Sequence, residues 1–307
     1  AVNTGTAAGD APGFMSSPGG SVAIIRFDES LGGTISLIEG ELRLSRPAAI
    51  FGPGADALAI DAGGESRVLN VGRAHDVWLR DLALRNGLSD NEEGGGGIYS
   101  LKTSLRVADS VIQECRAAAG GGIWIREGNL TVDGTEFRRN ETDAGPGGAI
   151  DAAGEWKDVI RSCVVKDCLF HENASFGAHA KGGAVNADFY SLSIENSTFQ
   201  GNASLSGGAV SVPADARIVN SVFVGNTAGK GGAIYGRKSD VHISLRVVNS
   251  TLVANWATDG GGILMDHPGK LTLLNSILVN DNGDDIGVNY TSSYTLDNYF
   301  GRNNLIG

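Results

Sequence analysis

Two aspartates and two basic residues between positions 151 and 188 have the types and spacing for sugar chemistry. If Asp151 and Asp188 lie one coil and two strand positions apart, their Cα atoms are about 8 Å from each other. Paired carboxylates at such a range serve as acid and base in inverting glycoside hydrolysis. Alternatively, Lys181 or His179 abstracts a sugar C5 proton while Arg126 neutralises a uronate, which gives a lyase. No catalytic string of known mechanism accompanies these residues.

Aromatic and polar side chains around the same positions are suited to binding a glycan. We expect the two tryptophans to stack on sugar faces and the charged groups to select substituents. The predicted substrate-binding residues are Trp124, Arg126, Trp156, Asn186, Tyr235 and Arg237. The longest insertions also occur here, around Trp156 and between Phe176 and Lys181, and long loops on a regular scaffold commonly wall binding sites.

Interpretations other than a catalytic or glycan-binding site also stay open for these residues. Outward strand positions are polar wherever they meet water, so the same residues fit a solvated face with no ligand. The leading hypothesis is an adhesin-like protein that engages extended carbohydrate or another surface without catalysis. A polysaccharide lyase or inverting glycoside hydrolase acting on an acidic polysaccharide is the alternative, and a purely structural spacer is the third.

A possible metal site lies near the end of the chain. Asp281, Asp284 and Asp285 gather three carboxylates around Gly283, which is a donor set for Ca²⁺. The segment lacks the EF-hand spacing and a later bidentate Glu, so a polar turn is the competing interpretation. No other cofactor is expected.

The residues above lie on a repeat. Three strings recur in one order over about 180 residues. The first, Gly-Gly-(Ala/Gly)-(Ile/Val), ends at Ile98, Ile123, Ile150, Val185, Val210, Ile234 and Ile263. The second is an apolar residue three positions before Asn140, Asn173, Asn202, Asn226 and Asn255. The third is Asn-Ser-x-apolar, at Asn196, Asn220, Asn249 and Asn275, with Asp109 and Asp167 as substitutes.

Each repeat reads as short strands separated by turns. Residues after the Ile/Val anchor alternate with period two, and a second strand follows, such as Leu130-x-Val132. Units of about 25 residues are shorter than a βαβ crossover. The sequence therefore predicts an all-β, single-domain, right-handed parallel β-helix: a solenoid of about ten coils of roughly 25 residues, with N- and C-terminal caps.

The repeat also predicts how particular residue types are used. The paired glycines allow turns with positive φ where a side chain would clash between coils. The recurring asparagines should form a hydrogen-bonded ladder along the axis. Phe137, Phe170, Phe199 and Phe223 should stack inside the coils. We predict an N-terminal arm and cap over 1–34, the β-helix over 35–280 and a C-terminal cap over 281–307.

The composition argues against nucleic acid and membrane as partners of this chain. The chain of 307 residues contains 46 Gly, and 24 basic against 35 acidic residues give a net charge of −11. An acidic chain repels polyphosphate, so no nucleic acid partner is expected. No apolar run approaches the roughly 18 residues of a membrane helix, so we expect no membrane insertion by this chain. Three cysteines without a CxxC string indicate neither a disulfide framework nor zinc.

The combination of Gly-Gly-Ala-Ile with Phe-x-x-Asn resembles the repeats of chlamydial polymorphic outer-membrane proteins and of bacterial surface β-helix proteins. The resemblance covers roughly residues 35–307. It implies a secreted or cell-surface bacterial protein, adhesive in its autotransporter members. The partner predicted from the aromatic and charged residues above is a polysaccharide or cell-surface glycan. The wider pectate-lyase-like group adds lyases, hydrolases and epimerases, by fold analogy alone.

Overall fold

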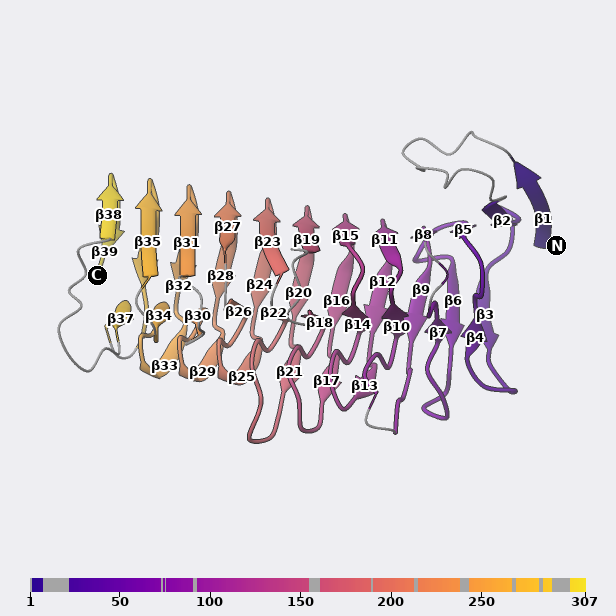
Figure 1. The fold of residues 1–307 in the computed structure, drawn as a ribbon, viewed down its shortest axis with the longest axis horizontal. Helices are drawn as coiled ribbons and strands as arrows, with labels where there is room; N and C mark the ends of the chain where they lie inside the picture. Colours follow the sequence, from indigo (N-terminus) through magenta and orange to yellow (C-terminus); the bar gives the residue numbers. More distant parts are fainter. Residues whose placement is uncertain are drawn as a thin grey trace.

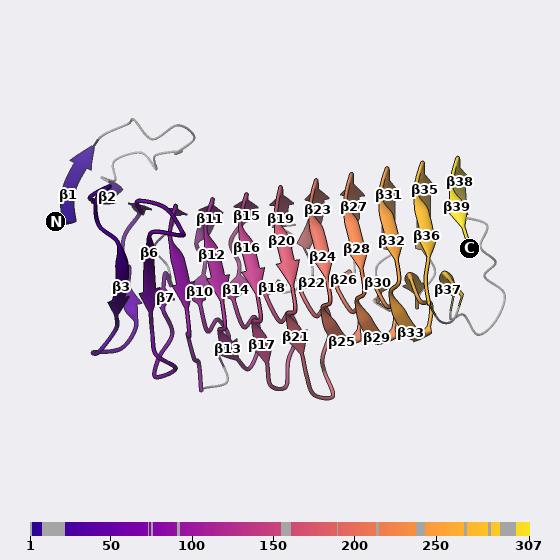
Figure 2. The same cartoon turned by 180° about the vertical axis from the view of Figure 1, so that it is seen from behind.

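The computed structural model describes residues 2–7, 22–72, 74, 76–90, 93–154, 161–188, 190–212, 215–237, 243–266, 269–281, 284–288 and 299–307. Their strands stack along one long axis, with the two termini at opposite ends (Figures 1 and 2). The predicted all-β parallel solenoid is confirmed. Among the described residues, no helix has the length and apolar character that crossing a membrane requires.

Three sheets, A, B and C, extend along most of the solenoid, and a shorter sheet D covers its central part, from β13 (Arg116–Ala117) to β33 (Trp256–Asp259). Sheet A contains β1 (Val2–Ala7), β2 (Val22–Phe27), β5 (Ala48–Phe51), β8 (Asp76–Arg80), β11 (Ser104–Ala108), β15 (Leu130–Asp133), β19 (Arg161–Lys166), β23 (Tyr190–Glu195), β27 (Ala216–Val219), β31 (Ile243–Val248), β35 (Gly269–Leu274) and β38 (Tyr299–Arg302). Sheet B contains β3 (Gly33–Ser36), β6 (Leu58–Asp61), β9 (Ala83–Arg85), β12 (Val111–Gln113), β16 (Glu136–Arg138), β20 (Leu169–His171), β24 (Thr198–Gln200), β28 (Val222–Val224), β32 (Thr251–Val253), β36 (Ile277–Val279) and β39 (Leu305–Ile306).

Sheets C and D complete the cross-section. Sheet C contains β4 (Leu42–Arg43), β7 (Leu69–Asn70), β10 (Ile98–Leu101), β14 (Ile123–Arg126), β18 (Ile150–Ala153), β22 (Val185–Asp188), β26 (Val210–Val212), β30 (Ile234–Gly236), β34 (Ile263–Met265) and β37 (Ile286–Val288). Sheet D contains β13 (Arg116–Ala117), β17 (Glu141–Thr142), β21 (Ala174–Ser175), β25 (Ala203–Ser206), β29 (Thr227–Lys230) and β33 (Trp256–Asp259).

Parallel pairing reaches into both segments that the sequence assigns to caps. Strand β2 pairs in parallel with β5, and β1 pairs with the other edge of β2 in antiparallel orientation. At the other end, β38 pairs in parallel with β35, and β39 with β36. The described residues near each terminus therefore add strands to the sheets of the solenoid.

The glycine pairs have the conformational and packing roles that the repeat predicts. Gly207 has φ +67°, in the left-handed region that L side chains rarely adopt. The second glycine of the pair, Gly208, has no such φ, but a Cβ there would collide with the carbonyl oxygen of Gly232 in the next coil. One glycine therefore makes the turn, and the other allows neighbouring coils to approach closely.

Two predicted ladders fill the interior. Phe137, Phe170, Phe199 and Phe223 are fully buried, and neighbouring rings stack with centroids 4.7 Å apart. In the asparagine ladder, each side-chain amide donates to the next coil's carboxamide oxygen and to a backbone carbonyl. Asn202 donates to Asn226 Oδ1 at 2.9 Å and to the carbonyl of Phe170 at 3.1 Å. Both ladders confirm the prediction.

Removing one rung of the asparagine ladder should destabilise the fold strongly. Asn202→Ala leaves the buried backbone N–H of Asn173 and the carbonyl of Phe170 without these partners. We expect the free energy of unfolding to fall by about 3 kcal/mol or more, measured by urea denaturation. The control is Asn220→Gly in the exposed outer ladder, where φ is +50° and glycine is well accommodated. Equal losses in the two variants would contradict the assigned role.

Candidate functional site

The outer side of sheet C carries two rows of side chains in strict register. In the first row, Trp124 pairs with Asp151 and Asp151 with Asn186 on successive strands. Ser211 and Tyr235 continue this row. The second row, two residues further along each strand, includes Arg126, Ala153 and Asp188 on β14, β18 and β22, with Arg237 and Asp266 just beyond β30 and β34. The predicted register of Trp124, Arg126, Asp151, Asn186 and Asp188 on neighbouring strands of one sheet is present.

The first row does not face solvent as the sequence predicts. Trp124 is 7% exposed, Asp151 1%, Asn186 2% and Tyr235 6%. Trp124 is covered by the segment before β10, because the backbone of Gly94 lies directly against the indole ring. The expectation of a solvent-facing tryptophan for sugar stacking is therefore wrong for Trp124 in this structure. Trp156 lies outside the described residues.

The aromatic part of the first row forms a stacked column. The rings of Tyr99 and Trp124 lie 4.8 Å apart at an interplanar angle of 11°. The guanidinium of Arg126 lies 4.9 Å from the centre of the Trp124 ring. The sequence predicts a binding role for Arg126, and this exposed cation is also part of the packing of the ribbon.

Asp151 is the most perturbed carboxyl of the ribbon. Its burial raises its pKa to about 7, while the hydrogen bond from Asn186 and the charge of Arg126 act in the opposite direction. Asn186 Nδ2 donates to Asp151 Oδ1 at 2.7 Å. Asp188 and Lys181 also act on Asp151 through their charges, so the structure brings five predicted site residues together. At 1% exposure the carboxyl is closed to a ligand in this structure.

The second row is held by ion pairs that cross coils. Arg237 Nη2 donates to Asp188 Oδ1 at 2.7 Å, although β26 lies between β22, which carries Asp188, and β30, which precedes Arg237. Asp266 Oδ2 accepts from the Tyr235 hydroxyl at 2.6 Å and from Lys230 Nζ at 3.3 Å. Burial, followed by the hydrogen bond to Asp266, raises the pKa of Tyr235.

Three members of this cluster were missed in the sequence-based prediction of site residues: Ser211, Lys230 and Asp266. Ser211 and Asp266 occupy the same offsets from their Ile/Val anchors as Asn186 and Asp188. Those offsets could have identified both residues. Lys230 lies on sheet D, and its contact with Asp266 leaves no periodic signal.

Two predicted groups are not joined to the cluster. His179 is exposed, and no hydrogen bond or ion pair links it to the ribbon within the described part of the chain. Asp285 is 6% exposed and accepts from Asn280 Nδ2 at 2.6 Å and from the backbone of Gly307 at 3.0 Å. Asp281 and Asp284 are exposed, and the described residues contain no group of three or more His, Cys, Asp or Glu suited to a metal ion. Calcium binding stays a prediction.

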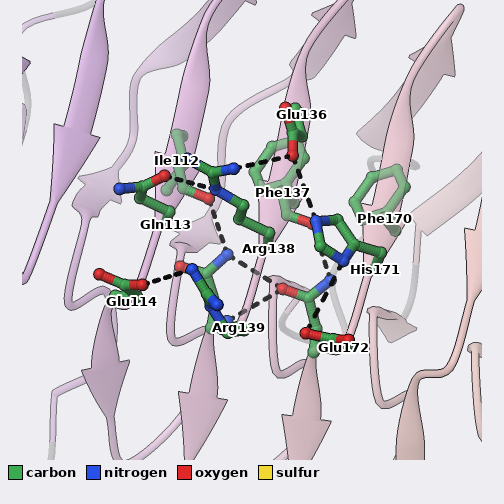
Figure 3. A network of polar contacts seen from close by, with 12 residues as sticks. Ile112, Gln113, Glu114, Glu136, Phe137, Arg138, Arg139, Phe170, His171 and Glu172 are labelled. Atoms are coloured by element: carbon green, nitrogen blue, oxygen red, sulfur yellow. Dashed lines mark hydrogen bonds and ion pairs between the residues drawn. The ribbon is translucent and has the colours of Figure 1, made fainter.

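A second polar network lies on the outer face of sheet B. Figure 3 shows it across β12, β16 and β20: Gln113, Glu114, Glu136, Arg138, Arg139, His171 and Glu172. His171 Nε2 lies 3.2 Å from Glu136 Oε1, and Arg139 Nη2 lies 2.6 Å from Glu114 Oε1. Apart from the buried Gln113, these side chains are partly or largely exposed and pair with one another, so the network has the character of a solvated, charge-compensated face.

Comparison with known proteins places the fold in a family. The family model described as the right-handed β-helix region matches residues 83–252. The chain therefore belongs to the right-handed β-helix family. No curated protein matches it.

Two solved structures are similar to the chain. Both are catalytic domains of a GH87 α-1,3-glucanase in complex with nigerose, with TM-scores of 0.37 and 0.35 and identities of 11% and 12%. Each comparison covers 89% of this chain, and the chain spans 63% of the length of each of those structures.

The buried carboxyl of Asp151 should make stability depend on pH. Asp151 has a folded-state pKa of about 7, against 3.8 for an unperturbed aspartate. Between these values the folded chain binds more protons than the unfolded chain, so its stability falls as pH rises. Relative to Asp151→Asn, the wild type should lose on the order of 4 kcal/mol between pH 4 and pH 8. Urea unfolding at several pH values measures this difference.

An exposed aspartate provides the matched control for this titration. Asp215 is exposed, so Asp215→Asn should follow the wild-type stability curve across the same pH range. Parallel curves for Asp151→Asn and the wild type would show that the Asp151 carboxyl is not the titrating group.

Proposed function

We propose that the protein is a secreted or cell-surface β-helix protein whose sheet C ribbon binds extended carbohydrate without altering it. One observation carries the proposal: charged side chains occupy matching positions on several coils of one sheet. Arg126, Asp188, Arg237 and Asp266 lie at second-row positions, with Ala153 between Arg126 and Asp188, and Lys181 lies beside Asp188 and Arg237. A row with a repeat of about 4.8 Å per coil presents contacts along an extended polymer.

The repeat itself supports the location outside the cell. Gly-Gly-Ala-Ile with Phe-x-x-Asn resembles repeats of adhesive bacterial surface proteins, and glycans displayed on cells or in their surroundings are partners of such proteins. The solved structures to which the chain is similar hold nigerose, an oligosaccharide, in a glucanase.

A glycan array should return at least one bound extended glycan, and Arg126→Ala should weaken its binding about tenfold. Arg126 is exposed, and loss of a charged hydrogen-bond donor has an effect of this size. The matched control is Arg217→Ala, because Arg217 is equally exposed but belongs to sheet A. An array of acidic and neutral glycans with no binder would refute the carbohydrate proposal. Equal losses of glycan affinity in Arg126→Ala and Arg217→Ala would refute the location of the binding site on sheet C.

A second candidate function is a polysaccharide lyase or inverting glycoside hydrolase. It is favoured by the different environments of two neighbouring carboxyls: Asp151 is buried with a pKa of about 7, whereas Asp188 is paired with Arg237. Pairs of carboxyls with contrasting environments commonly divide acid and base roles. The burial of Asp151 requires that the cover of the first row move before a sugar could reach it.

If the chain is an enzyme, a screen of acidic and neutral polysaccharides should reveal new reducing ends or absorbance at 235 nm. Asp188→Asn should then lower the rate by at least about 100-fold, as expected for loss of an acid–base group. Asp143→Asn on the exposed edge of sheet D serves as the control. Absence of turnover on every polysaccharide would eliminate this candidate and leave the binding proposal untouched.

A further inference from the structure

Two buried polar atoms near β26 have no hydrogen-bond partner among the described residues: Ser211 Oγ and Arg237 Nε. Ser211 is completely buried, in the first row between Asn186 and Tyr235. A buried donor without a partner costs about 1–3 kcal/mol. The fold therefore holds two donors in a state that is unfavourable without a ligand.

The connectivity places these two groups over the same coil. Asp188 lies on β22 and Arg237 just after β30, and β26 is the strand between them in sheet C. Because Arg237 Nη2 reaches back to Asp188, its side chain spans this coil at the level of the second row, two residues further along the chain than Ser211. Both unpartnered donors therefore belong to one short section of the ribbon.

Lys181 adds a third donor to this section. Its half-buried amine precedes β22, and no ion pair of Lys181 occurs among the described residues. Burial and the nearby charge of Arg237 lower its pKa, while Asp188 and Asp151 act in the opposite direction. Two cations thus lie close together in a partly desolvated place, an arrangement that an anion stabilises.

The neighbouring carboxylates are already engaged. Asp188 pairs with Arg237 Nη2, and Asp266 accepts from Tyr235 and Lys230. Asp151 accepts from Asn186 and, with a pKa of about 7, is largely uncharged in mildly acidic solution. Lys181 is therefore the cation of this section that lacks a matching negative group among the described residues.

We propose that Lys181, Arg237 and Ser211 form a binding site for an oxyanion, a carboxylate or sulfate group carried by a sugar of the bound glycan. The inference rests on the proposed carbohydrate function and names the chemical class of its ligand. Ser211 is as deeply buried as Asp151, so the cover of the first row must move before the ligand reaches its hydroxyl. Ammonium and guanidinium groups only donate hydrogen bonds, and the Ser211 hydroxyl is free to donate. An oxyanion accepts from all three, and such charge-assisted hydrogen bonds are stronger than those to a neutral hydroxyl.

Calorimetric titration at about pH 5.5 with three tetrasaccharides tests the proposal. The probes are tetragalacturonate, a sulfated galactose tetrasaccharide and the neutral galactose tetrasaccharide. At least one anionic probe should bind about tenfold or more tighter than the neutral one. The preferred anionic probe identifies whether a carboxylate or a sulfate is the natural group. Raising the salt concentration should reduce the difference.

Two variants separate recognition from folding. Lys181→Met should weaken binding of the anionic probe about tenfold and leave the neutral probe within twofold, whereas Lys270→Met, at an exposed lysine of sheet A, should change neither. Ser211→Ala should raise the melting temperature, because it removes a buried unpartnered hydroxyl, and still weaken the anionic probe. A merely structural serine would lower the melting temperature when replaced.

Three outcomes overturn this inference: equal affinity for anionic and neutral probes, no binding of either anionic probe, or unchanged anion binding in Lys181→Met. Binding of the neutral tetrasaccharide, or of any glycan on the array, leaves the carbohydrate proposal standing when the anion site fails. If no glycan on the array binds and none of the three tetrasaccharides gives a binding signal, both the anion site and the carbohydrate proposal are refuted.

Discussion

The stacking of one coil on the next in register is the constraint on which the rest of the structure depends. Backbone N–H and C=O groups of each coil pair with the neighbouring coils, so equivalent residues lie about 4.8 Å apart along the axis. At this spacing like side chains stabilise one another: phenyl rings stack, and carboxamides donate in series. Where even a Cβ would collide with the next coil, as at Gly208, only glycine fits.

The same constraint produces the candidate site. The interior Phe and Asn ladders repeat one residue type, whereas the first row of sheet C changes at every coil, from Trp124 to Asp151, Asn186, Ser211 and Tyr235. A solenoid needs no such variety, since a row of small or apolar residues would satisfy the packing. The register thus fixes where these different groups lie, while their identities are available for recognition. Burial then strengthens each electrostatic contact among them.

Much of this arrangement was predictable from sequence because its determinants are local to one repeat. Each glycine pair, each asparagine and the offsets of Asp151 and Asp188 from their anchors recur at fixed positions, so the register follows from alignment of the repeats. The burial of Trp124 was not predictable, since its cover comes from Gly94 in the preceding coil. The Arg237–Asp188 pair spans two coils and appears in no repeat unit. Non-local contacts therefore account for what the sequence pattern missed.

The two polar networks show why sheet C, and not sheet B, is the place to seek a ligand. On sheet B, groups such as Arg139 and Glu114 are 51% and 39% exposed, pair with each other and are solvated, so the fold explains them without a partner molecule. From the first row of sheet C, water is largely excluded, and Ser211 Oγ and Arg237 Nε are without partners among the described residues. An unsatisfied buried donor is destabilising in the absence of a ligand and becomes favourable when an acceptor enters. Two unpartnered donors within one section of the ribbon therefore make sheet C, and not sheet B, the place to seek a ligand.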